Sequence, residues 1–128
     1  MFEKLEIFQM AGAMARHAVT RQTEIARNTA NADTPGYKAR DVAPFSETYR
    51  QQTGGMQQRA TRPGHFARSD KFYPVVQNTG GGGESPNGNN VSLESEMMKS
   101  VEASSEHDRA LAIYKSSLNI LRLSLGRR

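Results

Sequence analysis

The chain has 128 residues, of which 36% are hydrophobic and 23% charged, and its formal net charge at pH 7 is +4. This length suits one domain, and the low apolar fraction argues against a thick self-contained core, so we expect part of the burial to come from partners. The lack of cysteine excludes disulfides, thiolate metal sites and a cysteine nucleophile. No run approaches the ~18 apolar residues of a membrane span. The opening MFEK has neither a basic start nor a following apolar run, so we expect no cleaved signal peptide.

Proline and glycine divide the chain into three segments. All five prolines lie between Pro35 and Pro86, and nine of the eleven glycines lie between Gly36 and Gly88. Both residue types are disfavoured inside helices, because proline removes a backbone donor and glycine costs backbone entropy. We therefore expect three parts: an N-terminal helix in residues 1–34, an irregular and partly flexible segment in residues 35–90, and a C-terminal helix in residues 91–128.

The N-terminal segment carries small and apolar side chains at alternating three- and four-residue steps, with charged side chains on the opposite face. This pattern is a heptad-like stripe, and its small residues allow a partner helix to approach closely. The stripe members that we expect to pack against another helix are Phe8, Ala11, Ala15, Ala18 and Ile25.

The middle segment has few apolar anchors. The run Phe72–Val76 fits one short strand or an extended anchor. Pro74 within this run favours the edge of a sheet, because proline cannot donate a ladder hydrogen bond. The run Gly80–Gly83 has the composition of a flexible linker.

The C-terminal segment shows the clearer helix signals. Ser92 can cap its N-terminus, glutamates follow in the first turn, and Gly126 can end the helix. One stripe of three- and four-residue steps runs along the segment, and we expect it to pack. Its members are Met97, Leu111, Tyr114, Leu118, Leu121 and Leu125.

These segments predict a mainly α fold. The simplest way to bury both stripes is to pair the N- and C-terminal helices as an antiparallel, coiled-coil-like inner domain, with further burial against neighbouring copies. The irregular Gly/Pro-rich middle segment leaves room for a short β element. Two stripes of this kind favour a protein that assembles with itself or with others.

The densest local signal is the run NTANADTPGYKARD at residues 28–41. Thr34 precedes a proline and is therefore disfavoured in the helical region. Pro35 and Gly36, which follow it, fit the central positions of a type II turn, because glycine accepts a positive φ. Asn and Asp side chains can hydrogen-bond the backbone at such a helix end. The residues alone thus predict a helix stop and turn, with Asn28, Asn31, Asp33, Pro35, Gly36 and Tyr37 as its main members.

This run resembles the signature near the N-terminus of bacterial flagellar rod and hook proteins, an Asn-rich Ala-Asn stretch ahead of a Gly-Tyr pair. The opening MFEKL is similar to the start of these proteins as well. At the other end the resemblance covers GNNVSLE at residues 88–94, EMM at 96–98, Tyr114 and the closing LGRR. Two separated motifs therefore agree in order and in distance from the termini. Within the family, the run at residues 31–41 is most similar to that of the proximal rod subunits.

The resemblance implies a structural subunit of the proximal rod of the flagellar basal body, which links the MS ring to the rest of the drive shaft for motility. Such axial proteins leave the cell through the flagellar type III export apparatus without a cleaved signal peptide. Their terminal helices pair into a coiled-coil inner domain and stack helically in the periplasmic rod. The partners implied are other copies of the chain, neighbouring rod proteins, the MS ring and a rod-to-ring adaptor protein.

The residues indicate no catalytic, cofactor-binding or metal site, and we expect neither an enzyme nor a small-molecule substrate. His17, His65 and His107 are far apart and lack companion ligands at metal spacing. We expect His17 and His107 on the polar faces of their helices. The run Gly80–Gly83 lacks the Lys-Ser/Thr of a phosphate-binding loop.

Two alternative functions stay open. One is another axial rod subunit of the same family. The other is a small basic nucleic-acid-binding protein that uses residues 59–73, in which Phe66, Phe72 and Tyr73 are interleaved with basic residues at loose spacing. Glycine and proline around this stretch prevent a basic stripe on a helix, so we interpret it as a solvated loop or a face that meets an acidic neighbour, and no nucleic acid is expected.

Overall fold

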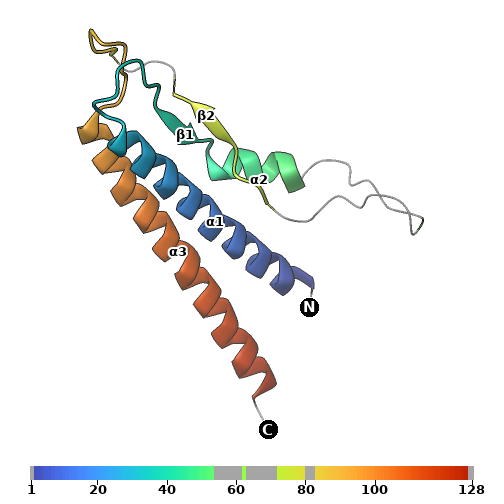
Figure 1. The fold of residues 1–128 in the computed structure, drawn as a ribbon. Coiled ribbons are helices and arrows are strands. Elements are labelled where there is room, and N and C mark those ends of the chain that lie inside the picture. Colours follow the sequence, from blue (N-terminus) through green and yellow to red (C-terminus); the bar gives the residue numbers. More distant parts are fainter. Residues whose placement is uncertain (1, 54–61, 63–71, 80–82, 127–128) are drawn as a thin grey trace.

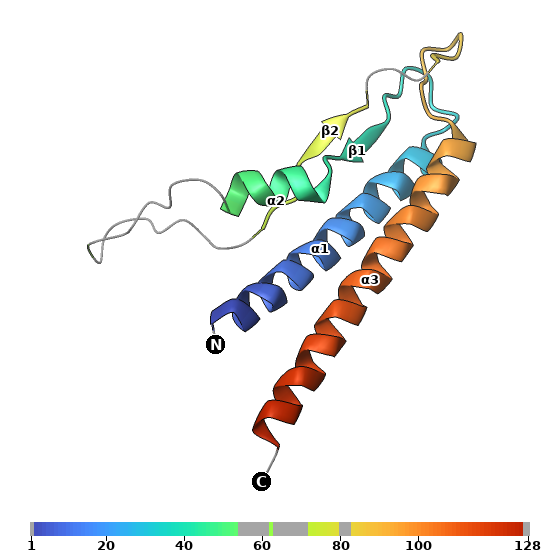
Figure 2. The same ribbon diagram turned by 180° about the vertical axis from the view of Figure 1, so that it is seen from behind.

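The computed structural model describes residues 2–53, 62, 72–79 and 83–126. Helix α1 is the central element: α3 packs along one side of it, and the small sheet and α2 lie on the other (Figures 1 and 2). The predicted mainly helical fold, with long antiparallel terminal helices and a short β element in the middle, is confirmed. The elements in chain order are α1 (Phe2–Ala30), β1 (Arg40–Val42), α2 (Phe45–Thr53), β2 (Val76–Asn78) and α3 (Leu93–Leu125).

The interior around α1 is built from small side chains. Among the side chains that the structure describes, buried alanines outnumber large buried apolar residues, and Ile25 is the largest buried apolar side chain of α1. Small residues let helix backbones approach closely, so the chain gains packing contacts without a thick core. The buried alanines of the two long helices are Ala11, Ala13, Ala18, Ala103 and Ala110.

The face of α3 that packs on α1 differs from the predicted stripe. The buried residues of α3 are Glu96, Ala103 and Ala110, which repeat every seven residues. Met97 and Leu111, which belong to the predicted stripe, are 70% and 50% exposed. Close packing on α1 selects the small residues, because Met or Leu at the same place would hold the two helices apart. Larger apolar residues such as Met97 and Leu111 are therefore left exposed on α3.

Both ends of α3 are as predicted. The Ser92 side chain accepts a hydrogen bond from the backbone N–H of Ser95 at 3.4 Å, and Ser92 itself has extended backbone angles. At the other end the Gly126 N–H donates to the Arg122 carbonyl at 2.7 Å. The cap and the glycine stop thus define a helix of 33 residues.

The middle segment holds a helix, α2, that the sequence analysis did not predict. Pro44 precedes it and accepts backbone hydrogen bonds from its first turn. Phe45 and Tyr49 lie one turn apart and stack with ring centroids 5.2 Å apart, and Phe72 meets Phe45 edge-on at 5.3 Å. The helix forms because this aromatic cluster gives a short segment of nine residues a place to pack.

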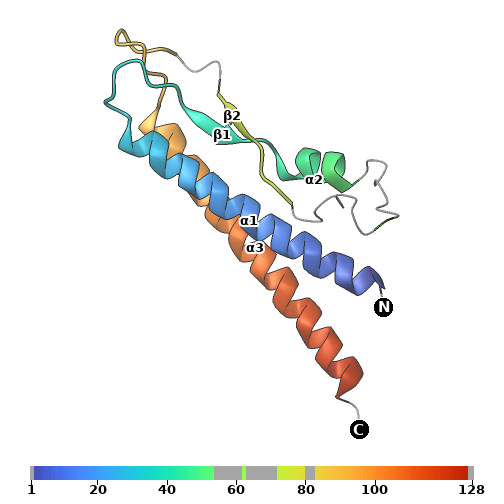
Figure 3. The ribbon, with the colours of Figure 1, turned by 45° about the vertical axis from the view of Figure 1, so that its right-hand side comes forward.

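The strand also lies elsewhere than expected. Strand β2 shares only Val76 with the predicted strand Phe72–Val76, and Phe72 is instead a buried anchor. Pro74 has no N–H for a ladder, which shifts the pairing toward the later residues. The two strands are antiparallel, with Arg40, Asp41 and Val42 opposite Asn78, Gln77 and Val76. Figure 3 shows the sheet running beside α1.

Two sequence predictions fall largely outside the described residues. Of the predicted linker Gly80–Gly83 the structure describes Gly83 alone, and of the basic stretch at residues 59–73 it describes Arg62, Phe72 and Tyr73. Among the helices that the structure describes, none is both long and apolar enough to cross a membrane.

The small-residue packing of α3 can be tested at Ala103, which is fully buried. Ala103→Leu should lower the free energy of unfolding by about 2 kcal/mol, because the larger side chain overpacks the helix pair. The matched control is Ala112→Leu on the exposed side of α3. This substitution should change the free energy of unfolding by less than about 0.5 kcal/mol. Urea unfolding followed by circular dichroism measures both. Equal effects of the two substitutions would contradict this packing.

Candidate assembly site

Two networks of polar side chains fix the geometry of the helix pair. One, which we call the asparagine clasp, consists of the side chains of Asn28, Asn89 and Asn90, where α1 ends and α3 is about to begin. The other, the polar seam, lies farther along α1 and α3. Its members are His17, Arg21, Asp41, Lys99, Glu102 and Glu106.

Asn28 is completely buried and joins three segments of the chain. Its Nδ2 donates to the Arg40 carbonyl at 2.7 Å and to Glu96 Oε2 at 3.0 Å. Its Oδ1 accepts from the Arg40 N–H at 3.0 Å and from the Tyr37 hydroxyl at 3.3 Å. Both donors and both acceptor positions of the amide are therefore used. Asn28 holds the start of β1 to α1 as a neighbouring strand would, and it ties both to α3.

Asn89 closes the end of α1. Its side chain is buried, and its Nδ2 lies 2.7 to 3.0 Å from three backbone carbonyl oxygens, those of Asn31, Ala32 and Thr34. These three carbonyls belong to the turn that directly follows α1, and the buried amide gives them a hydrogen-bond donor there. The Asn89 Oδ1 accepts from the Val91 N–H at 2.8 Å, which orients the chain just before α3.

Asn90 connects the same segment to the sheet. Its Oδ1 accepts from the Ala39 N–H at 2.6 Å, and its Nδ2 donates to the Thr79 carbonyl at 2.9 Å. The Thr79 N–H in turn donates to the Ala39 carbonyl at 2.9 Å. The three asparagines together fix how the chain passes from the helix pair to the sheet and back.

The predicted turn is confirmed. The Tyr37 N–H donates to the Thr34 carbonyl at 3.3 Å, and Gly36 between them has φ of +72°. The Gly36 N–H donates to the Asn87 carbonyl, and Gly88 lies so close that a Cβ there would be 3.5 Å from Gly36 Cα. The turn thus packs directly against the segment that leads to α3.

The other predicted motif residues play smaller parts. Asn31 Nδ2 donates to the Arg27 carbonyl at 2.7 Å at the end of α1, whereas Asp33 and Pro35 are exposed. The sequence analysis did not assign roles to Asn89 and Asn90. The sequence did contain a signal for these roles, namely two adjacent asparagines shortly before the helix cap at Ser92. Asparagine side chains readily hydrogen-bond to nearby backbone.

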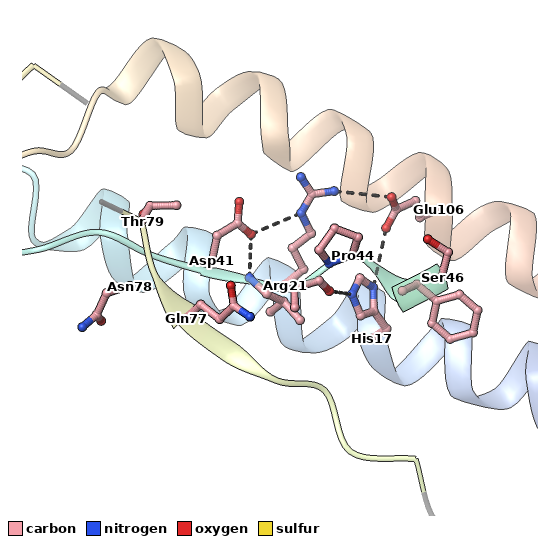
Figure 4. Close-up of a pocket in the computed structure, with 12 residues that line it drawn as sticks. His17, Arg21, Asp41, Pro44, Ser46, Gln77, Asn78, Thr79 and Glu106 are labelled. Carbon is pink, nitrogen blue, oxygen red and sulfur yellow. Dashed lines mark hydrogen bonds and ion pairs between the residues drawn. The ribbon is translucent and has the colours of Figure 1, made fainter. Parts of the chain in front are cut away.

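Arg21 is the centre of the polar seam. Its guanidinium nitrogens lie 3.4 Å from Asp41 and 3.4 Å from Glu106 (Figure 4). A third guanidinium contact, to Glu102, is 3.2 Å long, so Arg21 bridges β1 and α3. Asp41 has a second cationic partner, because Lys99 Nζ on α3 lies 3.6 Å from its Oδ2. Apart from the Arg21–Glu102 pair, which is exposed, these pairs are partly buried. Together they fix the register of α3 against α1, because a shift of one turn would separate them.

The prediction for His17 is wrong. We expected it on a polar helix face, but it is 2% exposed. Its Nε2 lies 2.8 Å from the Ala43 carbonyl, its Nδ1 lies 3.8 Å from Glu106, and its ring packs against Phe45 and Phe72. The apolar rings of the middle segment cover this side of α1 and bury the imidazole. His17 therefore anchors the start of α2 on α1.

The predicted stripe residues lie in different environments. Phe8 and Tyr114 meet edge-on across the two helices, with ring centroids 5.2 Å apart. Leu125, by contrast, is 82% exposed. Whether the exposed members pack in an assembly stays a prediction. Of the remaining members, Ala11, Ala18 and Ile25 are buried and Ala15, Leu118 and Leu121 are half-buried.

A groove of about 550 Å³ lies beside the polar seam, lined by His17, Arg21, Asp41, Glu106 and the backbone around Pro44 (Figure 4). Its charged side chains already face one another. Among the residues that the structure describes, no three His, Asp or Glu side chains gather in a way that could hold a metal ion. The arrangement serves to hold α3, β1 and α2 on α1.

Two curated relatives share one name. A flagellar basal body rod protein FlgB from Agrobacterium fabrum is 29% identical over 131 aligned residues, which cover 98% of this chain and 96% of the relative. A flagellar basal body rod protein FlgB from Salmonella typhimurium is 32% identical over 106 residues, which cover 77% of each chain. This chain belongs to the FlgB family of flagellar rod proteins. No protein-family model matches it.

Membership in the FlgB family confirms the resemblance inferred from the two terminal motifs. It makes the chain a structural subunit of the rod in the flagellar basal body. In a structural subunit the clasp and the polar seam have a clear purpose. They give one defined shape to a chain whose apolar core is small.

Asn28→Asp tests the clasp with almost no change in shape. The carboxylate cannot donate to the Arg40 carbonyl, and it would face the buried Glu96 carboxylate. We expect the free energy of unfolding to fall by about 3 kcal/mol or more, because a buried charge is left without a partner.

The control is Asn31→Asp, which removes one hydrogen bond near the surface and should cost less than about 1 kcal/mol. Urea unfolding of the purified chain distinguishes the two. If Asn28→Asp cost no more than Asn31→Asp, the clasp would not hold these segments together.

Proposed function

We propose that this chain is the proximal rod subunit, placed at the base of the rod, where it links the MS ring to the rest of the drive shaft. The observation that carries the proposal is the similarity to FlgB proteins over nearly the whole chain. The Asn31–Asp41 run and the opening MFEKL also resemble the proximal members of the axial family most closely.

The mechanism proposed is assembly. The helix pair would form the inner layer of the rod, and the outer side of α3 would pack against neighbouring subunits. Large apolar residues are exposed along α3, including Met97, Val101 and Leu123 at 70% to 76%. Burying such a side chain stabilises an interface by about 1.5–3 kcal/mol, so several together can drive association. Burial of this kind would supply what the small core of the single chain lacks.

The clasp would set the direction in which the sheet and α2 leave the helix pair. Because Asn28 and Asn90 bond to β1 and its neighbours, the middle segment cannot swing freely about the end of α1. A fixed angle here would place every copy of the middle segment at the same position on the surface of the rod. That regularity is what a helical assembly of identical subunits requires.

The proposed partners are other copies of the chain, neighbouring rod proteins, the MS ring and the rod-to-ring adaptor protein. The chain would pass through the flagellar type III export apparatus and take its place in the periplasmic rod without removal of a signal peptide. In this role the polar seam and the groove beside it are structural, and we propose no catalytic activity for them.

Quantitative mass spectrometry of purified hook–basal bodies tests the function. We expect this chain at a fixed number of copies per basal body. In a strain that makes no hook and no distal rod, it should remain bound to the ring fraction, because a proximal subunit is added before them. The chain's absence from basal bodies that contain the other rod proteins would refute the proposal. Its loss together with the distal rod would refute the proximal position.

A further inference from the structure

Helix α3 carries opposite charges in its two halves. Residues 93–106 contain four glutamates against one lysine, a net charge of −3, whereas residues 107–126 contain one aspartate against two arginines and one lysine, a net charge of +2. Part of the acidic half is neutralised within the chain, because Arg21 faces Glu102 and Glu106. Among the described residues, no ion pair includes Glu94 at one end or Lys115 and Arg122 at the other.

Large apolar side chains accompany both charged halves. Met98 and Val101 in the acidic half are 67% and 71% exposed, and Ile120 and Leu123 in the basic half are 54% and 76% exposed. Within the described part of the chain, the sheet and α2 lie beyond α1, on the side away from α3 (Figures 1 and 2). The outer side of α3 thus has an acidic-apolar half and a basic-apolar half.

The two halves match in spacing. Val101 and Leu123 are 22 residues apart, as are Met98 and Ile120, and Glu94 and Lys115 are 21 apart. At ~1.5 Å per residue, one axial shift of about 33 Å brings all three pairs opposite each other. A shift of 21 or 22 residues is close to six helical turns of 3.6 residues, so the same side of the helix also faces the partner.

We propose that the basic half of α3 in one copy docks on the acidic half of α3 in a second copy, with the helices parallel and staggered by about 33 Å. The proposal rests on the proposed function, because the subunits of a rod all point the same way. Parallel helices without a stagger would place acidic half beside acidic half. An antiparallel pair would also match the charges, but it closes into a two-fold dimer and cannot continue into a rod.

A disulfide cross-link tests the stagger, since the chain has no cysteine of its own. Val101→Cys and Leu123→Cys are introduced together at two exposed positions, and purified hook–basal bodies carrying this variant are oxidised mildly. We expect a ladder of dimers, trimers and longer multimers of the chain, because each copy links to one neighbour through Cys at 101 and to another through Cys at 123. The controls are the two single variants, neither of which should cross-link.

Each other outcome overturns the proposal. A double variant that stops at the dimer indicates an antiparallel, closed pair. A cross-link in either single variant indicates helices without a stagger. Absence of any cross-link, in basal bodies that contain the chain in normal amount, refutes the contact while the proposed function stands. Absence of the chain from wild-type basal bodies would refute the function instead.

Charge exchange provides the second measurement in the same double-cysteine chain. Glu94→Lys or Lys115→Glu alone should lower the ladder yield about fivefold, because like charges then face each other across the contact. The two together should restore it to within about twofold, since the pair is re-formed with its signs reversed. Both positions are exposed, so neither change disturbs the fold. Equal yields in all four chains would show that these charges do not meet.

Discussion

The buried amide of Asn28 is the interaction on which the rest of this structure depends. An amide without partners costs free energy when it leaves water, but here all four of its hydrogen-bonding positions are used. Its partners belong to three segments, the turn with Tyr37, the start of β1 at Arg40, and α3 at Glu96. One side chain thus decides where the middle segment leaves α1 and how α3 returns to it.

Around this point the chain uses different forces for different tasks. Alanines let α1 and α3 approach closely, and Arg21 with its three carboxylates fixes their register. An aromatic cluster with the buried His17 fastens α2 to the far side of α1. Several larger apolar residues of α3, among them Met97, Val101 and Leu123, remain exposed in the single chain. A subunit built in this way has a defined shape and leaves a row of large apolar side chains exposed on α3.

The sequence alone predicted the terminal helices, the Ser92 cap, the Gly126 stop and the turn at Pro35-Gly36, because each depends on local backbone chemistry. It did not predict which side of α3 meets α1. Hydrophobic periodicity marks a side that favours burial, but of the stripe on α3 Tyr114 meets Phe8 of α1 while Met97, Leu111 and Leu125 stay exposed in the single chain. The tertiary contacts of Asn89 and the burial of His17 were missed for a related reason. The carbonyl that His17 contacts is 26 residues away in the chain, and the carbonyls that Asn89 contacts are 55 to 58 residues away.

Amide hydrogen exchange, followed by NMR on the full chain, tests the central role of the clasp most directly. The amides of Ala39, Arg40 and Val91 donate to the side-chain oxygens of Asn90, Asn28 and Asn89. They lie in short or irregular segments, where exchange would otherwise be fast. The account predicts that these three amides are protected as strongly as those in the middle of α1. Exchange at the rate of an open loop, while α1 stays protected, would show that the helix pair forms without the clasp and would contradict the account.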